Sequence, residues 1–535
     1  MTMSETVDAI LRQFEYNKSK RTNWESQWSE VADYFLPNQS GNWSLDGMID
    51  ELTTGQKKGE LIYNSKPVLD LAMFVGIADG LLTPVNKKWH TLKPKDKSLL
   101  KDKRVMDWYY EVNEVLFDYR YNPGSNFAEQ NNMRWEQMGA YGTGLLFIDY
   151  DKTEILRYKC INLKNVTLGQ NHQGIVDRVD RVLHLSLLDI ISKFGKSGLP
   201  DTLLIGLDDV ASANKKLMVL HSVMPAKEKE GYSSYYILIK DRVLLSEGIY
   251  ATFPYSVSRY NTSPDEVFGR GLAMQCMSDV LNLNKYQNDI NLALDGSIKP
   301  TVLTQDDSIA DNGVIDMAPN SVIVGGLDHN GNPKMVPFRD GVRVDWVAAE
   351  IDRLESRIDE TFLITLFQIM IENPRMTAYE VMTRAQEKSM LLTPLLVRQQ
   401  NQSLNPLIKR ELSILYEAGL LPDMPVEVEN IFNVTFQSPV NDMQDSESLS
   451  NINKVMQTIL PLIQNNPDAL NIVDLHKLVK MAFIDGNIPS TILKSDKQVE
   501  QETEARAKQE QEANFAEQAV NTSEVLKNLK GVENV

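Results

Sequence analysis

The sequence predicts an α+β protein that is mainly helical. Apolar residues recur at helical spacing over most of the chain, short β-type runs cluster between about residues 142 and 255, and a β-rich insert separates two long helical stretches. The chain has 535 residues, of which 42% are hydrophobic and 24% are charged, as in soluble proteins with a large core. At roughly 150 residues per domain, this length predicts three or four structural units.

The N-terminal part is predicted to be helical. Four apolar residues there fall on one helix face: Trp24, Trp28, Val31 and Phe35. A second helix is expected between residues 64 and 84, because Ser65 and Pro67 form a favourable helix start. Further helices are expected over 103–119 and 126–139. Residues 87–104 carry eight Lys or Arg and two Asp, and we expect either a solvated loop or an electrostatic contact.

A long helix is expected from Phe268 to about residue 297, near thirty residues or about 45 Å. A β-rich insert follows, with Asn330-Gly331 as a hairpin tip. The helix after the insert carries a narrow apolar stripe at Val347, Ile351, Leu354, Ile358 and Phe362. Such a stripe requires neighbouring helices, and the simplest partners are copies of the same chain.

The next helix has a strong start. Thr377 and Glu380 form a capping box, so residues 365–376 are expected to be a loop between two long helices. Pro394 and Pro406 are expected to kink or break the helix that follows the capping box.

The composition of the chain limits the classes of protein to which it can belong. The most apolar run, residues 68–82, contains Asp70 and Asp79 and is too short and too charged to span a bilayer, and the N-terminus lacks a secretory signal. Two cysteines, Cys160 and Cys276, argue against a disulfide framework or a cysteine-ligated zinc, and indicate folding in a reducing cytoplasm. A net charge of −18 is atypical of nucleic-acid binding, yet it suits a protein that lets DNA pass without gripping it.

Signals for an enzyme are weak. The Gly-Arg-Gly at 269–271 lacks the third glycine of a dinucleotide fingerprint. Gly195-Lys196-Ser197 has Ile190 where a phosphate-binding loop needs glycine, so we expect this glycine to cap a helix. Asp149 and Asp151 indicate a strand entering a polar turn or, less favoured, a metal-dependent nuclease site. We predict no catalytic, cofactor-binding or metal-binding residues.

Three stretches of the chain carry a family pattern. They are LLTPVNKKWHTLKP (81–94), SRYNTSPDEVFGRGLAMQCMSDVLNLNKYQ (258–287) and RMTAYEVMTRAQEKSMLLTPLLVRQQNQSLNPLIKREL (375–412). Together they resemble the portal, or head-to-tail connector, proteins of short-tailed phages, and the likeness runs from about residue 8 to residue 485. Phe268 and Gly271 stand where the family pattern has Tyr and Ser, so a helix-capping hydroxyl is missing here.

The resemblance implies the portal fold. Its parts would be a wing over 1–265, stem helices over 266–297 and 341–364 flanking a β-containing clip at 298–340, a tunnel loop at 365–376, a long wing helix and return over 377–430, and a helical crown with C-terminal tail over 431–535. The composition of residues 495–520 suits either a solvent-exposed helix or a partly disordered tail.

The resemblance also implies a function and partners. The family forms a homo-oligomeric ring, typically of twelve subunits, at one capsid vertex, where double-stranded DNA is packaged and ejected. The implied partners are major capsid and scaffolding proteins, the terminase large subunit and then tail adaptors, with no membrane and no cofactor. Assembly would take place in the host cytoplasm and the product would be part of the virion. Another structural virion component, a tail or minor capsid protein, is the alternative.

Four groups of residues are candidates on this mapping. Facing the channel we expect Asn373, Arg375, Asp352, Glu355 and Asp359. At the clip we expect five residues that either dock a basic partner or form a solvated rim: Asp306, Asp307, Asp311, Asp328 and Asn330. The wing would turn into the stem at Gly269, Arg270 and Gly271, and the stem seam would comprise Val347, Ile351, Leu354 and Ile358. Arg270 is expected to bond carbonyls or a carboxylate, and Arg375 to touch phosphates or form an intersubunit salt bridge.

Overall fold

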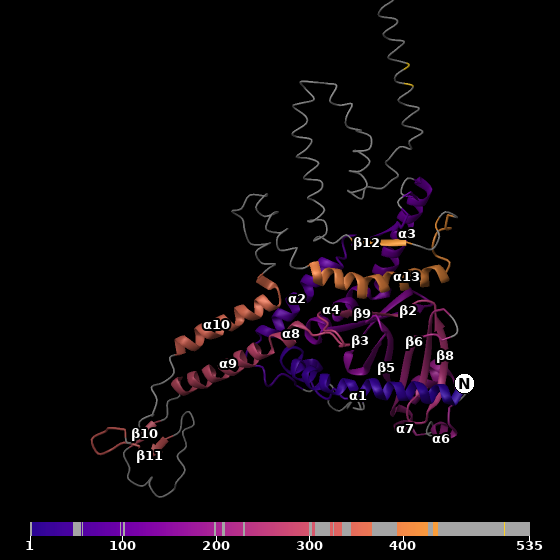
Figure 1. Ribbon diagram of the computed structural model, residues 1–535. Coiled ribbons are helices and arrows are strands. Elements are labelled where there is room, and N and C mark those ends of the chain that lie inside the picture. The colour runs from indigo at the N-terminus through magenta and orange to yellow at the C-terminus, as the bar shows by residue number, and fades with distance from the viewer. Residues whose placement is uncertain are drawn as a thin grey trace, which may run out of the picture. The chain divides into compact units, whose positions relative to one another are not determined.

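The computed structural model describes residues 3–45, 55, 57–96, 98–99, 102–196, 199–205, 209–227, 230–298, 302–304, 322–324, 326–333, 344–365, 393–425, 428, 432–436, 505 and 508. These residues form a mixed α+β protein (Figure 1). The chain divides into two compact units. The first draws on Met1–Trp89 and Leu116–Leu420, and the second includes His90–Val115 and Leu421–Thr435. The second unit thus contains part of the segment expected to be wing.

Three helices form the core of the first unit. They are α1 (Met3–Phe35), α2 (Lys66–Leu82) and α4 (Phe127–Tyr141). The predicted face of α1 is buried at Trp28, Val31 and Phe35, and the Trp28 ring lies 5.0 Å from that of Phe268. Helix α2 begins after Ser65 with a proline in its first turn. The predicted positions of these helices are therefore confirmed.

Two antiparallel sheets make up the β part of this unit. A three-stranded sheet has the order β3 (Ile155–Ile161), β2 (Thr143–Asp151), β9 (Tyr255–Arg259). A five-stranded sheet has the order β4 (Val166–Gln170), β5 (Val176–Ser186), β6 (Lys216–Pro225), β7 (Tyr232–Leu238), β8 (Val243–Tyr250). Short helices connect the strands: η5 (Leu163–Asn165), α5 (Leu187–Phe194), α6 (Asp201–Leu204) and α7 (Val210–Asn214).

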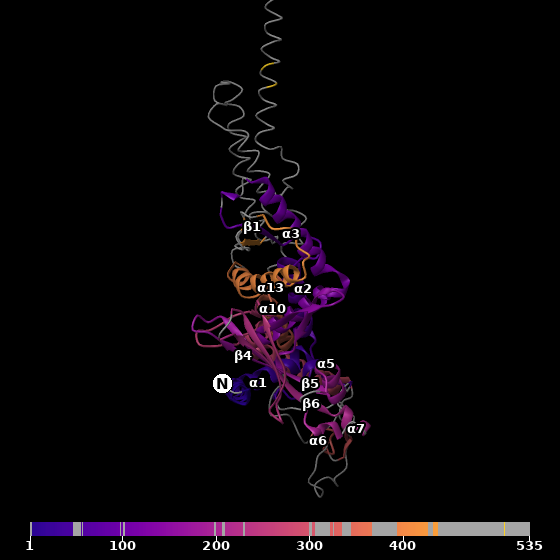
Figure 2. The same ribbon diagram turned by 90° about the vertical axis from the view of Figure 1, so that its right-hand side faces the viewer.

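The five-stranded sheet is covered on both faces (Figure 2). On one face, Ile10 and Phe14 of α1 pack against Leu220. On the other face, Ile190 of α5 packs against Val219. Successive side chains of a strand point to opposite faces of the sheet. Because both faces of this sheet are covered, the side chains on both faces are buried, which explains the continuous apolar runs of this region.

A helix beginning by residue 393 continues through a π-helical segment, η8 (Gln400–Leu404), into α13 (Asn405–Glu417). Pro406 has no N–H for the carbonyl four residues earlier, and the wider π turns accommodate this loss. Ser403 Oγ lies 2.9 Å from the hydroxyls of Ser256 and Ser258, which joins the π segment to β9. The proline at 406 therefore falls at a π segment, and the helix continues past it instead of breaking.

The expected first long helix is shorter than predicted. A short helix, α8 (Leu272–Gln275), is separated from α9 (Met277–Ile298) by a break at Cys276, whose φ is −97° and ψ 10°. Helix α9 has 22 residues, or about 33 Å rather than 45 Å. Helix α10 (Val344–Thr361) lies beside α9 (Figure 1). Between them, β10 (Val302–Thr304) and β11 (Val322–Val324) form a parallel pair, in agreement with the predicted β insert.

The second unit contains a strand where a solvated loop had been the leading expectation. Strand β1 (His90–Pro94) pairs with β12 (Phe432–Phe436). Asn113 lies on α3 (Lys103–Tyr121). Its side-chain oxygen accepts a hydrogen bond from the Leu92 N–H at 2.9 Å, so a side chain satisfies one backbone group of β1. Among the helices that the structure describes, none has the length and apolarity needed to cross a membrane.

Candidate functional site

The Gly-Arg-Gly segment at 269–271 lies against the C-terminal end of α4. Gly142 caps α4 with a φ of 79°, and the Gly269 N–H donates to Thr143 Oγ1 at 2.8 Å. A Cβ atom on Gly269 would lie 2.3 Å from the Gly142 carbonyl oxygen, and one on Gly271 would lie 2.4 Å from that of Ala140. Both positions exclude a side chain because backbone contacts backbone there. These glycines are packing residues, and no phosphate cradle is formed.

Arg270 is held by protein groups. Its N–H donates to the Asn261 carbonyl at 2.7 Å, and its guanidinium donates to the Glu266 carboxylate at 3.0 and 2.5 Å. The guanidinium also lies over the Trp24 ring, 5.1 Å from the centroid. The hydrogen bonds with Arg270 lower the pKa of Glu266. The expectation that Arg270 bonds a neighbouring carboxylate is confirmed.

Helices α9 and α10 form an antiparallel hairpin. Arg357, near the end of α10, pairs with Asp279, near the start of α9, at 3.1 Å. Of the predicted seam, Ile351, Leu354 and Ile358 are 8%, 3% and 0% exposed within the single chain, and Val347 is half-buried. The expectation that this stripe needs other copies was wrong, because α9 and α2 of the same chain pack against α10.

A segment of residues 61–66, here called the clasp, holds the hairpin. Lys66 Nζ lies 2.6 Å from Asp359 Oδ1, and Asn64 Nδ2 donates to Glu355 Oε1 at 2.9 Å. On the α9 side, the Asn284 amide accepts from the Tyr63 N–H at 2.7 Å and donates to the Leu61 carbonyl at 2.6 Å. The clasp therefore fixes both helices of the hairpin to the segment that leads into α2.

Lys66 of the clasp also pairs with a buried carboxyl group. Asp70 of α2 has a side chain that is 1% exposed, and its Oδ1 forms an ion pair with Lys66 Nζ at 3.1 Å. Burial raises the pKa of Asp70 to about 6; Lys66 opposes this rise, whereas Asp359 and Glu355 add to it. Burial works to lower the pKa of Lys66, but its contacts with Asp359 and Asp70 outweigh burial and raise the pKa.

The predicted channel-facing carboxylates occupy different environments. Glu355 and Asp359 contact the clasp, whereas Asp352 is exposed. Asn373 and Arg375 lie outside the described residues, as do three of the clip candidates: Asp306, Asp307 and Asp311.

The other two clip candidates lie in a tight loop. An antiparallel bridge between Leu327 and Pro333 closes it, and Gly331 has a φ of 81°. The Asp328 carboxylate accepts from the N–H groups of Asn330 and Asn332, both at 2.8 Å. Asp328 therefore shapes the turn, and the prediction that Asn330-Gly331 lies at a hairpin tip is confirmed.

The former nuclease candidates lack the surroundings of a metal site. The Asp151 carboxylate accepts from the N–H groups of Thr153 and Glu154 at 2.8 and 3.1 Å, which closes the turn between β2 and β3. Burial raises the pKa of Asp149, and the neighbours that oppose this rise include Arg410 and Lys193. Within the described ranges, no three His, Cys, Asp or Glu side chains gather in a way that could hold a metal ion. Asp149 therefore faces cations rather than further metal ligands.

The remaining phosphate-loop candidate is a helix cap. Gly195 ends α5 with a φ of 84°, and its N–H donates to the Ile191 carbonyl at 2.9 Å. This confirms the expected cap.

Comparison with known families identifies the chain. The sequence profile described as "Bacteriophage head to tail connecting protein" matches residues 7–493. The chain belongs to this family. Members are structural proteins without enzymatic activity, so this portal-family chain is a virion component of the head–tail junction.

Two curated relatives agree. A "Probable portal protein" of Bordetella phage BPP-1 is 24% identical over 479 residues, covering 85% of this chain and 83% of the relative. The "Portal protein" of Salmonella phage epsilon15 is 22% identical over 535 residues, covering 96% and 93%. Among solved structures, chains described as "Neck of empty GTA particle computed with C6 symmetry" and "Neck of native GTA particle computed with C12 symmetry" align over 73% of this chain and 86% of theirs, at 10% identity and TM-scores of 0.34 and 0.32.

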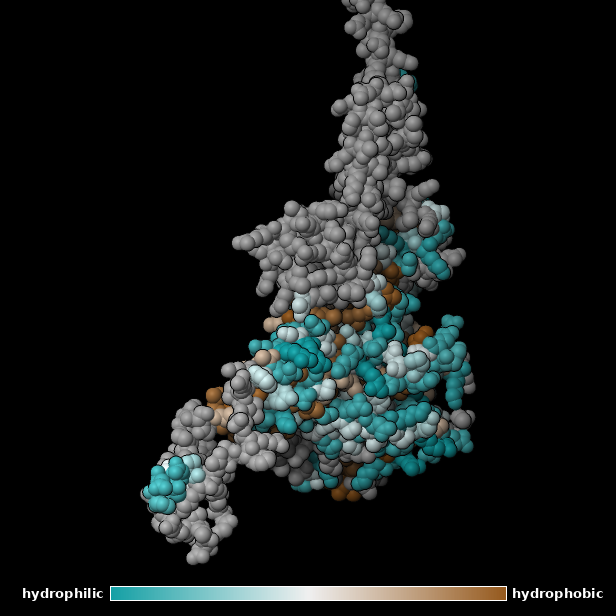
Figure 3. All heavy atoms as spheres, turned by 60° about the vertical axis from the view of Figure 1, so that its left-hand side comes forward, coloured by the Kyte–Doolittle hydropathy of each residue, from teal (hydrophilic) through white to brown (hydrophobic). Residues whose placement is uncertain are grey.

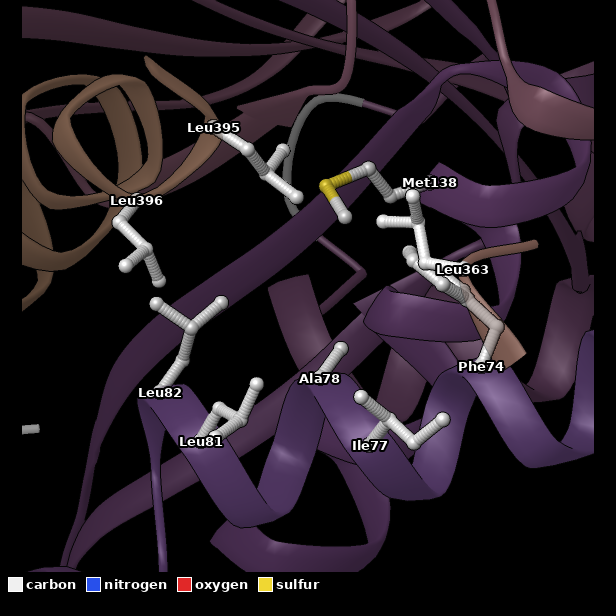
Figure 4. Close-up of a pocket in the computed structure, with 9 residues that line it drawn as sticks. All are labelled: Phe74, Ile77, Ala78, Leu81, Leu82, Met138, Leu363, Leu395 and Leu396. Atoms are coloured by element: carbon white, nitrogen blue, oxygen red, sulfur yellow. The ribbon is translucent and has the colours of Figure 1, made fainter. Parts of the chain in front are cut away.

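The portal-family chain has an apolar pocket that could not hold a polar cofactor. The space within it that can admit a water-sized molecule is about 20 Å³. Nine apolar side chains line it (Figure 4): Phe74, Ile77, Ala78, Leu81, Leu82, Met138, Leu363, Leu395 and Leu396. A lining without polar side chains offers no group to orient a phosphate, a carboxylate or a metal.

The clasp was not predicted from the sequence. One signal was present: Asp70 stands inside the most apolar run of the chain, where a buried carboxyl group needs a partner. The partner of Asp70 is Lys66, which could be identified from the helical spacing of four residues. Asp359, the second partner of Lys66, could not be found from spacing because it lies 293 positions after Lys66.

Proposed function

We propose that this portal-family chain forms a closed ring of twelve copies at one capsid vertex, and that the ring is the conduit for packaging and ejection of double-stranded DNA. The observation that carries the proposal is the α9–α10 hairpin with its β insert. It corresponds to the stem and clip expected from the family, with α9 and α10 as the stem helices. In this proposal the wing, the tunnel loop and the crown are assigned to the residues predicted for them from the sequence.

Exposed apolar side chains on the hairpin support the ring. Leu292 and Leu294 of α9 are 58% and 48% exposed, and Trp346 of α10 is 72% exposed. Among the residues coloured in Figure 3, most are otherwise hydrophilic, and the apolar ones lie in separate patches. A neighbouring hairpin would remove these side chains from water. They replace the buried stripe as the residues through which copies associate.

The charge of the hairpin supports a DNA conduit. Helix α10 contains six acidic and two basic residues. Like-charge repulsion would keep DNA from adhering to a wall built from such helices. Asp352, which is exposed, is our first choice for a wall residue, and Asn373 and Arg375 remain candidates for a tunnel loop.

Partners would use the clip and the wing. In this proposal the terminase large subunit docks on the clip during packaging and is later replaced by tail adaptors, while capsid and scaffolding proteins surround the wing. Terminase, and not this chain, would hydrolyse ATP.

Negative-stain electron microscopy of the purified full chain tests the proposal. We expect closed rings with a central hole. Filaments or stable monomers under all assembly conditions would instead indicate another structural role in the virion and overturn the conduit.

A further inference from the structure

Two rows of side chains face each other between the sheets of the first unit. The row on the three-stranded sheet follows the register of β3, β2 and β9 and holds Lys159, Phe147 and Tyr255. The row on the five-stranded sheet follows the register of β5, β6 and β7 and holds Arg181, His221 and Tyr236. Each row therefore begins with a cation and continues with aromatic rings.

Direct contacts join the two rows into one aromatic floor. Tyr255 Oη lies 3.1 Å from His221 Nδ1, and His221 Nε2 lies 3.0 Å from Ser234 Oγ. The His221 ring stacks on the Tyr236 ring with centroids 4.2 Å apart, and the Phe147 ring lies 5.8 Å from that of His221. Burial lowers the pKa of His221 to about 3, so this histidine is neutral and the floor carries no charge of its own.

Three cations surround this floor, and we call them the basic rim: Lys159, Arg181 and Lys193. Lys193, in the last turn of α5, lies 4.7 Å from the centroid of the Tyr236 ring. Lys159 and Lys193 are exposed, and Arg181 is half-buried. Partial burial and then the nearby Arg181 lower the pKa of Lys159; burial also lowers the pKa of Lys193, where Asp149 opposes the shift and Arg181 and Lys159 add to it.

The carboxylate that interacts with the basic rim is shared with another cation. Asp149 interacts with Lys193 but also with Arg410. In the described part of the chain, neither Lys159 nor Lys193 forms an ion pair. The rim thus holds an excess of positive charge on a protein whose net charge is −18. An anion at the rim would relieve the mutual repulsion of these cations.

We propose that the basic rim binds an acidic segment of a partner polypeptide. Three cations around an uncharged floor match a few neighbouring carboxylates. Duplex DNA is the less favoured ligand because its affinity comes from many phosphate contacts along an extended basic surface, whereas the rim offers three cations. The proposal goes beyond the DNA conduit and holds for a single subunit.

The test uses the full chain and fluorescently labelled hexaglutamate. Anisotropy at low salt should show binding that weakens as salt is added. The Lys159→Gln/Lys193→Gln variant should bind roughly tenfold more weakly or worse. The control variant Lys240→Gln/Lys285→Gln removes the same charge from two exposed lysines elsewhere and should bind like the wild type. Equal binding by both variants, or no binding by the wild type, would refute the proposal.

A second measurement does not depend on the variants folding. Amine acylation followed by mass spectrometry should label Lys159 and Lys193 faster than Lys285, and hexaglutamate should protect the first two. A labelled DNA duplex serves as the competing ligand in both assays. If DNA binds the rim more tightly than hexaglutamate at the same salt concentration, the assignment to an acidic polypeptide is overturned.

Discussion

Two alanine substitutions on the α9–α10 hairpin separate subunit folding from ring assembly. Ile358 of α10 is 0% exposed, whereas Leu292 of α9 is 58% exposed. Ile358→Ala leaves a cavity in the single chain and should cost about 2–5 kcal/mol of subunit stability. Leu292→Ala removes a side chain that the subunit leaves in water, and should change subunit stability by no more than about 0.5 kcal/mol.

For ring assembly the order of the two variants should be reversed, with Leu292→Ala having the larger effect. Burying the exposed part of Leu292 against a neighbouring copy is worth about 1–2 kcal/mol per interface. This loss would be repeated at every interface of a closed ring. Leu292→Ala should therefore raise the protein concentration at which rings form, while its subunit unfolds at the wild-type temperature.

The assay combines thermal unfolding of the dilute subunit with mass photometry over a concentration series. Leu188→Ala is the matched control, because Leu188 is also a half-exposed leucine on a helix, at 50%, but lies on α5 rather than on the hairpin. If Leu292→Ala lowers Tm as much as Ile358→Ala does, or forms rings at the wild-type concentration, the reasoning fails.

Three further predictions concern packing and charge. Gly271→Ala places a Cβ 2.4 Å from a backbone oxygen and should lower stability by about 1–3 kcal/mol, whereas Gly76→Ala, with nothing within 4 Å, should be neutral or stabilising by calorimetry. Glu411→Gln breaks a fully buried ion pair with Arg120 and should cost about 3–5 kcal/mol in denaturant unfolding; a loss below 1 kcal/mol would contradict this. Because the folded-state pKa of Asp70 is raised from 3.8 to about 6, the native state binds its proton more tightly. Stability should therefore fall by about 3 kcal/mol as pH rises through this window. Asp70→Asn should abolish that part of the pH dependence, and an unchanged Tm–pH slope would argue against it.

Features decided by a few neighbouring residues could be predicted from the sequence. Ser65 and Pro67 mark the start of α2, and Gly195 marks the end of α5. The turn after β2 forms because the Asp151 carboxylate accepts from backbone groups two and three residues later. These features depend on residues only a few positions apart, so they can be predicted without knowing the fold.

The break in the first long helix could not be located in this way. The helical spacing of apolar residues continues across Cys276, and neither Gly nor Pro stands at the break. Periodicity therefore predicted one helix where the structure has α8 and α9.

The sequence alone determined the family, the places of helices α1 to α4, and which faces of the helices are apolar. Only the tertiary structure decided what covers those faces: the stripe of Ile351, Leu354 and Ile358 is buried by the same chain. It also decided the charge partners, such as Lys66 with Asp359 and Arg120 with Glu411, which are 293 and 291 positions apart. The physical reason is that burial of apolar surface has no direction and ion pairs carry no sequence spacing, so a pattern shows that a side chain needs a partner but not which one.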